Sequence, residues 1–334
     1  MNSLQHFGVI GGGAWGTALA QMLVRAGRDV TVWAREPEVV TAINIEHENT
    51  VFLPSFKLDA RVKAVGTLND LVTCDAWLLA TPTQHVRSLS EQLVALASTK
   101  NQPIIIAAKG IEQGTLALPG DIVAQLLPAH PLAVLSGPTF ALEVAQDHPT
   151  ALTLACMNTE LGQRLTHAIS SPTFRPYLSD DIVGAQIGGA IKNVLAVACG
   201  IATGAGMGDN ARAALITRGL AEMMRLGIVL GGQAETLMGL SGLGDLVLTC
   251  SSLQSRNMSL GVALGQGGSL QKIMSGRTSV AEGVFTAAAA AALARKHGLE
   301  MPIVAAVDAV LNHNAAVKDI ITALLARPLK TEKN

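Results

Sequence analysis

Short apolar runs alternate with stretches of helical periodicity over the first half of the chain. Apolar runs at residues 7–10 and 29–33 flank a helical pattern at residues 14–26, which predicts a strand, a helix and a second strand in close succession. Such a βαβ unit pairs its strands in parallel. The later runs predict five more buried strands, at residues 62–65, 76–80, 104–107, 132–136 and 151–155. Helical patterns at residues 86–98 and 121–127 separate several of them, so we expect an α/β fold with a Rossmann-like, doubly wound parallel sheet.

The pattern changes near residue 180. Beyond this point strand-like runs nearly vanish, and helical patterns rich in Ala, Gly and Leu take their place. The predicted helices cover residues 181–203, 210–230, 280–297 and 303–311. Pro302 precedes the last of them and suits the first turn of a helix. We therefore expect two domains, a sheet domain at residues 1–180 and an all-α C-terminal domain at residues 181–330, with a polar tail that frays.

Composition argues against several classes of protein. With 334 residues, of which 49% are hydrophobic, the chain is long enough for two hydrophobic cores. The formal net charge is −1 and only 3% of residues are aromatic, so we expect no nucleic-acid partner, because such surfaces are basic and often stack aromatic rings on bases. The four cysteines lack the spacing of a metal site. We expect them to be free thiols in a reducing compartment, and we expect no metal.

One stretch is long and apolar enough to resemble a membrane span. Residues 182–207 are mostly apolar, yet they include Gln186, Lys192, Asn193 and several glycines. Polar side chains of this kind are costly inside a bilayer, so we predict a buried helix of a soluble protein and no membrane span. The N-terminus lacks the basic region of a signal peptide, which favours a cytoplasmic location.

The turn after the first predicted strand carries the glycine pattern Gly11-x-Gly13-x-x-Gly16. Between a strand and a helix this pattern is the fingerprint of dinucleotide binding, in which backbone amides and the helix N-terminus hold a pyrophosphate. Arg35 and Glu36 follow the second strand. An arginine there favours the 2′-phosphate of NADP(H), whereas an acidic residue favours the free hydroxyl of NAD(H), so the sequence leaves both cofactors open.

Several charged residues have surroundings that suit chemistry. Lys192 lies in an apolar run of small residues with no acidic neighbour in sequence. Burial of an ammonium group is costly and lowers its pKa, which makes the lysine a usable proton donor and acceptor. Lys109 follows an apolar strand, at the edge of the sheet that faces the ligand crevice in such folds. Asp245 lies in a glycine-rich apolar segment, and residues 254–257 cluster donors that suit a phosphate. Together these residues favour hydride transfer.

These motifs extend along nearly the whole chain, in an order that closely resembles the bacterial-type NAD(P)-dependent glycerol-3-phosphate dehydrogenases. The matching segments are Gly-Gly-Gly-Ala-Trp-Gly (11–16), Ala-Lys-Gly (108–110), Ser-Gly-Pro-Thr-Phe-Ala (136–141), Gly-Gly-Ala-Ile-Lys-Asn-Val (188–194), Ala-Leu-Ile-Thr-Arg-Gly-Leu-Ala-Glu-Met (214–223), Gly-Leu-Gly-Asp-Leu-Val-Leu-Thr-Cys (242–250), Gln-Ser-Arg-Asn (254–257) and Val-Ala-Glu-Gly (280–283). The resemblance implies reversible reduction of dihydroxyacetone phosphate to sn-glycerol 3-phosphate with NADPH or NADH, the step that supplies glycerophospholipid biosynthesis.

The resemblance also implies roles for individual residues. Lys192 would accept the proton in alcohol oxidation and donate it in the reverse direction, with Lys109 and Asp245 as further catalytic residues. The substrate would be held by Lys109, Gly137, Thr139, Lys192, Asp245, Thr249, Ser255, Arg256 and Asn257. The cofactor would contact Gly11, Gly13, Ala14, Trp15, Gly16, Arg35, Lys109, Ala141, Arg256, Val280 and Glu282. No metal is implied, and a homodimer is the assembly that we expect.

Two positions depart from the family pattern, and two other functions stay open. Ala14 replaces a serine found in many members, which removes one hydroxyl contact to the cofactor phosphates, and Glu36 stands where relatives often have a basic or neutral residue. A two-domain dehydrogenase of hydroxy acids would share this layout, but it needs a carboxylate-binding site in place of residues 254–257. A non-catalytic NADP(H)-sensing protein would keep the fingerprint and lose the chemistry. The set of candidate catalytic residues speaks against it.

Overall fold

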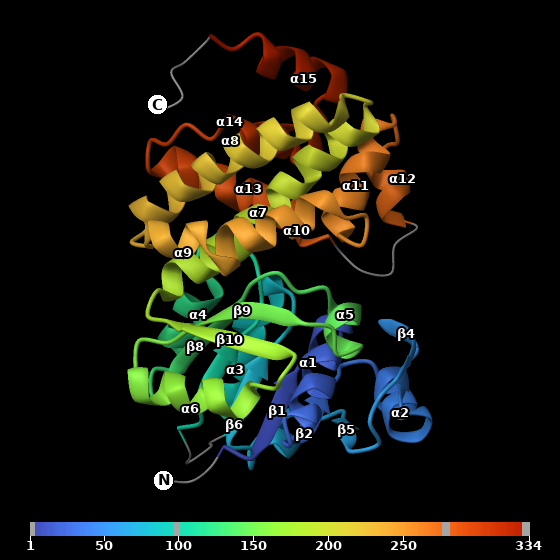
Figure 1. Cartoon of the computed structure of the whole chain (residues 1–334), viewed down its shortest axis with the longest axis vertical. Coiled ribbons are helices and arrows are strands. Elements are labelled where there is room, and N and C mark those ends of the chain that lie inside the picture. Colours follow the sequence, from blue (N-terminus) through green and yellow to red (C-terminus); the bar gives the residue numbers. More distant parts are fainter. Residues whose placement is uncertain (1–3, 97–100, 276–280, 329–334) are drawn as a thin grey trace.

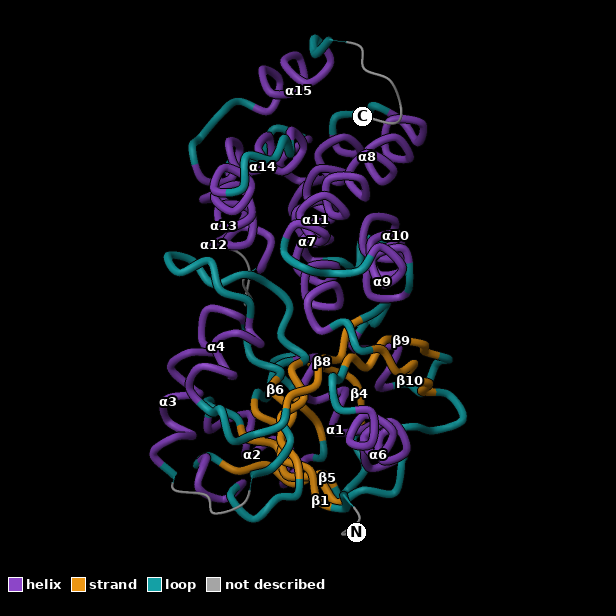
Figure 2. The backbone as a smooth tube through the Cα atoms, turned by 90° about the vertical axis from the view of Figure 1, so that its left-hand side faces the viewer, coloured by secondary structure: helices purple, strands orange, loops and turns teal. Residues whose placement is uncertain are grey.

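The computed structural model describes residues 4–96, 101–275 and 281–328. A sheet with covering helices forms one end of the molecule, and a group of helices forms the other (Figures 1 and 2). The strands of the large sheet are β1 (His6–Ile10), β2 (Asp29–Trp33), β5 (Val62–Val65), β6 (Ala76–Leu79), β7 (Ile104–Ile106), β8 (Leu132–Ser136), β9 (Thr150–Ala155) and β10 (Phe174–Ser179). Every strand predicted from the sequence is present, and β10 was not predicted.

The order of the strands is that of a doubly wound sheet. From one edge to the other it runs β5-β2-β1-β6-β7-β8-β9-β10, and the strands from β5 to β8 are parallel. The direction of winding reverses between β1 and β6. In such sheets ligands bind at this switch point, outside the carboxyl ends of the strands. The predicted fold class is therefore confirmed.

The far edge of the sheet departs from the all-parallel arrangement that we expected. β9 runs antiparallel to β8, and β10 runs parallel to β9. The connection from β8 to β9 contains only the short helix α5 (Ala141–Ala145), so the chain turns back at the same end of the sheet, as an antiparallel neighbour requires. Pro176 interrupts the strand pattern of β10 and cannot donate a ladder hydrogen bond, which is tolerated because β10 is the edge strand.

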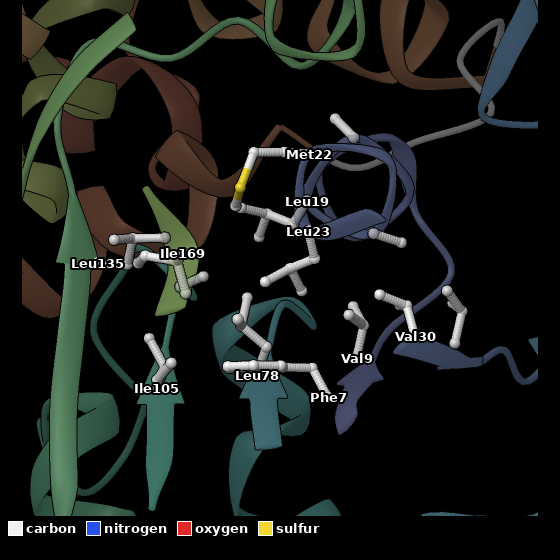
Figure 3. Close-up of a cluster of buried hydrophobic side chains, with 14 of the residues drawn as sticks. Phe7, Val9, Leu19, Met22, Leu23, Val30, Leu78, Ile105, Leu135 and Ile169 are labelled. Carbon is white, nitrogen blue, oxygen red and sulfur yellow. The ribbon is translucent and has the colours of Figure 1, made fainter. Parts of the chain in front are cut away.

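Helices cover both faces of the sheet and bury alternate strand residues. α1 (Ala14–Arg25) and α6 (Thr159–Ile169) pack on one face, while α3 (Val86–Ala95) and α4 (Pro119–Leu126) pack on the other. Figure 3 shows Phe7 and Val9 of β1 beneath Leu19 and Leu23 of α1. Ile10 belongs to the core on the opposite face. Elements that the sequence did not predict here are α2 (Pro37–Glu46), α5, α6, the hairpin of β3 (Glu48–Asn49) and β4 (Leu53–Lys57), and the short helices η1 (Leu68–Leu71) and η2 (Thr83–His85).

Helices are the regular secondary structure of the described residues that follow β10. These helices are α7 (Ile182–Gly204), α8 (Gly208–Val229), α9 (Ala234–Met238), η3 (Leu240–Gly244), α10 (Asp245–Ser251), α11 (Arg256–Gly265), α12 (Leu270–Ser275), α13 (Glu282–Lys296), α14 (Pro302–Asn312) and α15 (Val317–Leu325). The four long helices predicted here correspond to α7, α8, α13 and α14. The sheet ends at Ser179 and α7 begins at Ile182, and the division into two domains at this point stays a prediction.

Helix α7 runs through the middle of the helical half (Figure 2) and is its core element. By length and composition α7 could cross a membrane, but its apolar window is almost entirely buried by the rest of the protein, as in a core helix. Glycines let α11 approach it closely. A Cβ on Gly200 would lie 2.2 Å from the carbonyl oxygen of Met258, and a Cβ on Gly261 would lie 2.2 Å from that of Val197. Small residues thus allow α7 and α11 to pack closely.

Candidate active site

The glycine-rich turn at residues 11–16 follows β1 and opens α1. Gly11 has a φ of +125°. A Cβ on Gly16 would lie 1.9 Å from the carbonyl oxygen of Gly11, so only glycine allows the turn to fold this tightly. At Gly13, in contrast, a Cβ would meet no described atom within 4 Å. This open space at the N-terminus of α1 suits a pyrophosphate.

Polar atoms near the turn fit a bound dinucleotide. The indole Nε1 of Trp15 and the hydroxyl groups of Thr81 and Thr83 are buried, and within the described part of the chain they have no hydrogen-bond partner. Thr81 and Thr83 follow β6, the neighbour of β1 across the switch point. Buried polar atoms are seldom unpaired, so these groups indicate a ligand in the crevice. The residues present therefore fit a nicotinamide dinucleotide at the place that the fingerprint predicts.

Lys109 lies at the carboxyl edge of the sheet, as predicted. It follows β7, and its Nζ donates a hydrogen bond of 3.0 Å to the carbonyl oxygen of Gly137, which follows β8. The hydroxyl of Thr139 donates to the same carbonyl at 3.1 Å. The ends of two neighbouring strands thus hold this ammonium group at the mouth of the crevice.

Asp245 connects this edge of the sheet to the helical half. Its side chain is fully buried at the start of α10. Asp245 Oδ2 accepts from Lys109 Nζ at 2.8 Å, and Asp245 Oδ1 accepts from Lys192 Nζ at 2.5 Å. Lys192 also donates to the hydroxyl of Thr249 at 3.0 Å. One carboxylate therefore serves two ammonium groups, and the cluster keeps a net positive charge when both lysines are protonated.

The surroundings of Lys192 tune its proton affinity. The residue is 7% exposed, and burial lowers its pKa to about 8. The negative charge of Asp245 opposes this effect, and the positive charge of Lys109 adds to it. A lysine with a pKa near 8 exists in both protonation states close to neutral pH, as a group that gives and takes a proton requires.

The N-terminus of α11 presents the predicted anion-binding residues beside this cluster. The Ser255 hydroxyl caps the helix by accepting from the amide of Met258 at 3.2 Å. Asn257 donates through Nδ2 to Asn193 Oδ1 at 2.9 Å, and its own Oδ1 accepts from the amide of Gly283 at 3.1 Å. Both contacts fix the orientation of the Asn257 amide. Arg256 occupies the first position of α11. A helix N-terminus with such side chains suits a phosphate group.

Glu282 links the two halves of the chain at the crevice. It is the first residue of α13, and its Oε1 accepts from the backbone amide of Thr83 at 3.1 Å. Burial raises the pKa of Glu282 to about 7, and the hydrogen bond from Thr83 opposes the shift. The positive charges of Arg256, Lys109 and Lys192 oppose it further.

The structure thus brings residues from distant parts of the sequence into one crevice. Asp245 lies directly beside Lys109, Lys192 and Thr249, and Ala141 opens the short helix that follows the Gly137 turn. The predicted cofactor contact Val280 lies outside the described residues.

Three residues of the crevice were missed by sequence reasoning. Thr81 and Thr83 follow the carboxyl end of β6, a position that could have signalled both. Asn193 had no signal beyond its place next to Lys192.

A doubly wound sheet with a dinucleotide-binding turn, facing a lysine–carboxylate cluster from a helical half, defines a nicotinamide-dependent dehydrogenase. Comparison with known proteins narrows this class. Residues 6–162 match the family model described as NAD-dependent glycerol-3-phosphate dehydrogenase N-terminus, and residues 181–322 match the model of the C-terminus. The chain belongs to the NAD-dependent glycerol-3-phosphate dehydrogenase family.

Individual relatives agree with this assignment over the full length. A protein named glycerol-3-phosphate dehydrogenase [NAD(P)+] from Parvibaculum lavamentivorans is 54% identical over 324 residues, covering 97% of each chain. One of the same name from Caulobacter vibrioides is 55% identical over 332 residues, covering 99% of each. The crystal structure of glycerol-3-phosphate dehydrogenase from Coxiella burnetii superposes with a TM-score of 0.93 at 38% identity, covering 97% of this chain and 99% of that one.

Proposed function

We infer that this chain catalyses the reversible reduction of dihydroxyacetone phosphate to sn-glycerol 3-phosphate with NADH or NADPH, and so supplies glycerol 3-phosphate for glycerophospholipid synthesis. One observation carries the proposal. Asp245 holds the ammonium groups of Lys192 and Lys109 together at the carboxyl edge of a dinucleotide-binding sheet. A ketone placed there meets a proton donor and an excess of positive charge.

Lys192 is the proposed proton donor for ketone reduction. A nicotinamide dinucleotide held by the turn at residues 11–16 would supply the hydride for the carbonyl carbon, and negative charge would then grow on the carbonyl oxygen. The buried ammonium of Lys192 stabilises this charge and gives up its proton to the oxygen. In alcohol oxidation the neutral amine takes the proton back. Asp245 and Thr249 hold the Lys192 Nζ in place through their hydrogen bonds.

The phosphate of the substrate is the proposed ligand of the α11 N-terminus. Ser255, Arg256 and Asn257 would bind it through charge and hydrogen bonds, and Lys109, Gly137 and Thr139 would line the opposite side of the crevice. A clamped phosphate holds the carbonyl in one orientation, and orientation supplies much of an enzyme's rate. In the cofactor site, the turn at residues 11–16 would hold the pyrophosphate. Arg35, Ala141 and Glu282 would make the further contacts.

The loss of NADPH or NADH absorbance with dihydroxyacetone phosphate as oxidant tests the function. We expect turnover with this substrate and none with small keto acids, which lack a phosphate. Preference for a keto acid would instead identify a hydroxy-acid dehydrogenase. Tight nucleotide binding with no turnover on either oxidant would identify a non-catalytic sensor of the nucleotide.

We also propose that two copies of the chain associate through the helical half. A cavity of about 920 Å³ lies between α7, α8, α14 and α15, lined by apolar side chains that include Leu215, Val307, Ile320 and Leu324. Ile228 on α8 and Leu325 on α15 are 51% and 74% exposed. Large apolar side chains that are exposed to solvent favour a protein–protein interface on this half of the chain.

The expected cytoplasmic location is a further proposal. It rests on the proposed use of a phosphorylated substrate and of a nicotinamide dinucleotide, which are available inside the cell. Fractionation of cells that express the full chain checks it, since enzyme activity should stay with the cytosolic fraction.

A further inference from the structure

The segment that follows β2 lies directly against the glycine-rich turn. A Cβ on Gly12 would lie 2.5 Å from the Cβ of Ala34, so the two backbones are in close contact. Arg35 and Glu36 come next in the chain, immediately before α2. In sheets of this type, the residues at this place face the 2′ position of the adenosine ribose. The 2′ position is where NADP(H) carries a phosphate and NAD(H) a hydroxyl group.

Arg35 already forms an ion pair with Glu36 in the structure. Its Nε and Nη2 both donate to Glu36 Oε1, at 3.1 Å and 2.8 Å. The Arg35 side chain is 73% exposed, and that of Glu36 is 26% exposed. Glu36 is also the N-cap residue of α2, whose carbonyl oxygen accepts from the amide of Val39 at 3.1 Å. The Glu36 carboxylate is therefore the more buried partner of this pair, and the Arg35 guanidinium is the more exposed one.

We propose that Glu36 sets the coenzyme preference by competing with the 2′-phosphate for Arg35. This inference rests on the proposed nicotinamide-dependent function. With NAD(H), the free ribose hydroxyl can donate to the Glu36 carboxylate while Arg35 stays paired. With NADP(H), the phosphate has to draw Arg35 away from Glu36 and is repelled by the same carboxylate. Glu36 thus weakens NADP(H) binding selectively, and the chain accepts both coenzymes.

The size of the effect follows from the exposure of the pair. Exposed ion pairs are weak, because water and salt screen them. Removal of the competing charge should therefore tighten NADP⁺ binding by about threefold to fivefold and weaken NAD⁺ binding by about threefold or less. The preference between NADP⁺ and NAD⁺ should therefore change, while the protein still binds both coenzymes.

Isothermal titration of the full-length protein with NADP⁺ and with NAD⁺ tests the proposal without an activity measurement. Four proteins are compared: the wild type, Glu36→Gln, the double variant Arg35→Ala/Glu36→Gln, and Glu38→Gln as a control. Glu38 lies in the first turn of the same helix and is exposed, so its substitution makes the same change of charge nearby. We expect Glu36→Gln to tighten NADP⁺ binding by about threefold to fivefold. The double variant should lose this gain, and the control should match the wild type.

Two results would overturn the inference and leave the proposed function standing. One is an equal shift in Glu36→Gln and Glu38→Gln, which would mean a general effect of surface charge. The other is a gain in NADP⁺ affinity that persists in the double variant, which would mean that Arg35 is not the group competed for. A wild-type protein that binds neither nucleotide would overturn the proposed function itself, and the inference with it.

Discussion

Lys192 depends on Asp245, Thr249 and its own burial for its position and its proton affinity. We expect Lys192→Ala and Lys192→Met to lower turnover by about 10³-fold or more, because both remove the proton donor and the positive charge that stabilises the oxyanion. The nucleotide turn is formed by residues 11–16, so the dissociation constant for the nucleotide should stay nearly unchanged. Stopped-flow turnover and nucleotide titration measure the two quantities. Normal turnover in the Met variant would remove Lys192 from the mechanism.

The pH dependence of the reaction should report the same group. With a pKa of about 8, Lys192 loses its proton as the pH rises through 8. Ketone reduction needs the ammonium form, so its kcat/KM should fall above pH 8, whereas kcat/KM for alcohol oxidation should rise over the same range. Profiles of kcat/KM in both directions check this pair of opposite slopes.

Neighbouring charges should move this pH profile in opposite directions. Lys109→Met removes a positive charge that lowers the pKa of Lys192, so the profile should shift to higher pH. Asp245→Asn removes a negative charge that raises that pKa, so the profile should shift to lower pH. Shifts of the same sign in the two variants would contradict the assignment of the titrating group to Lys192.

For single residues, the sequence indicated which side chains suit proton transfer. It did not indicate which of them contact one another in the folded protein. The apolar surroundings of Lys192 predicted its burial, and the position of Lys109 after a strand predicted its place at the crevice. No periodicity, however, places Asp245 beside either lysine, because the contacts depend on how α7 and α10 pack. The family resemblance implied the catalytic roles of Lys192, Lys109 and Asp245, and these roles stay predictions.

The packing of helix α7 against helix α11 depends on the absence of side chains at their contact. A Cβ on Gly200 would lie 2.2 Å from the Met258 carbonyl, so Gly200→Ala forces the two helices apart. We expect a loss of about 2–3 kcal/mol in the free energy of unfolding. Because Ser255, Arg256 and Asn257 begin α11, the KM for dihydroxyacetone phosphate should rise as well. Urea unfolding and initial rates measure both effects.

Gly66→Ala provides the matched control for this substitution. At Gly66 a Cβ would meet no described atom within 4 Å, so the same chemical change should cost little stability. Equal destabilisation by both variants would mean that the close helix contact is not the cause.

The contact between Glu222 and the N-terminus of α14 should make the free energy of unfolding depend on pH. The Glu222 carboxylate accepts from the amides of Ile303 and Val304 at its N-terminus, at 2.8 and 3.1 Å, and burial raises the pKa of Glu222 to about 7. Because this folded-state pKa lies above the unfolded value of about 4.3, folding favours the protonated form. The resulting stability is present in full below the unfolded pKa and is lost as the pH rises through 7. Between pH 5 and pH 8 the ionisation of Glu222 should lower the free energy of unfolding by about 2–3 kcal/mol.

Glu222→Gln isolates this contribution. Glutamine keeps an oxygen that can accept from the α14 amides but carries no charge at any pH. Urea unfolding at pH 5 and pH 8 should therefore show a smaller pH dependence in this variant than in the wild type. An unchanged dependence would assign the effect to other groups.

The elements also show where sequence patterns fail. Apolar runs and helical periodicity located β1, β2, the strands from β5 to β9 and the long helices, because burial on the sheet faces dictates them. Helix α5 is too short for a periodic signal. Strand β10 was missed because Pro176 interrupts its apolar run, and proline argues against a strand. The direction of β9 depends on which end of the sheet its connection returns to, and a single sequence does not encode this in its periodicity.

The whole molecule gives the last prediction, which concerns assembly. If the apolar surface of α8 and α15 pairs two copies, the wild type should have twice the mass of the 34.5 kDa chain in solution. Ile228→Glu places a charge on this surface and should reduce the mass to that of one chain. Ile45 on α2 is 73% exposed on the sheet half, so Ile45→Glu makes the same change away from the proposed interface. Light scattering after size exclusion measures all three masses. A wild type with the mass of one chain would contradict the proposed dimer, and the cavity between α7, α8, α14 and α15 would then belong to the single chain.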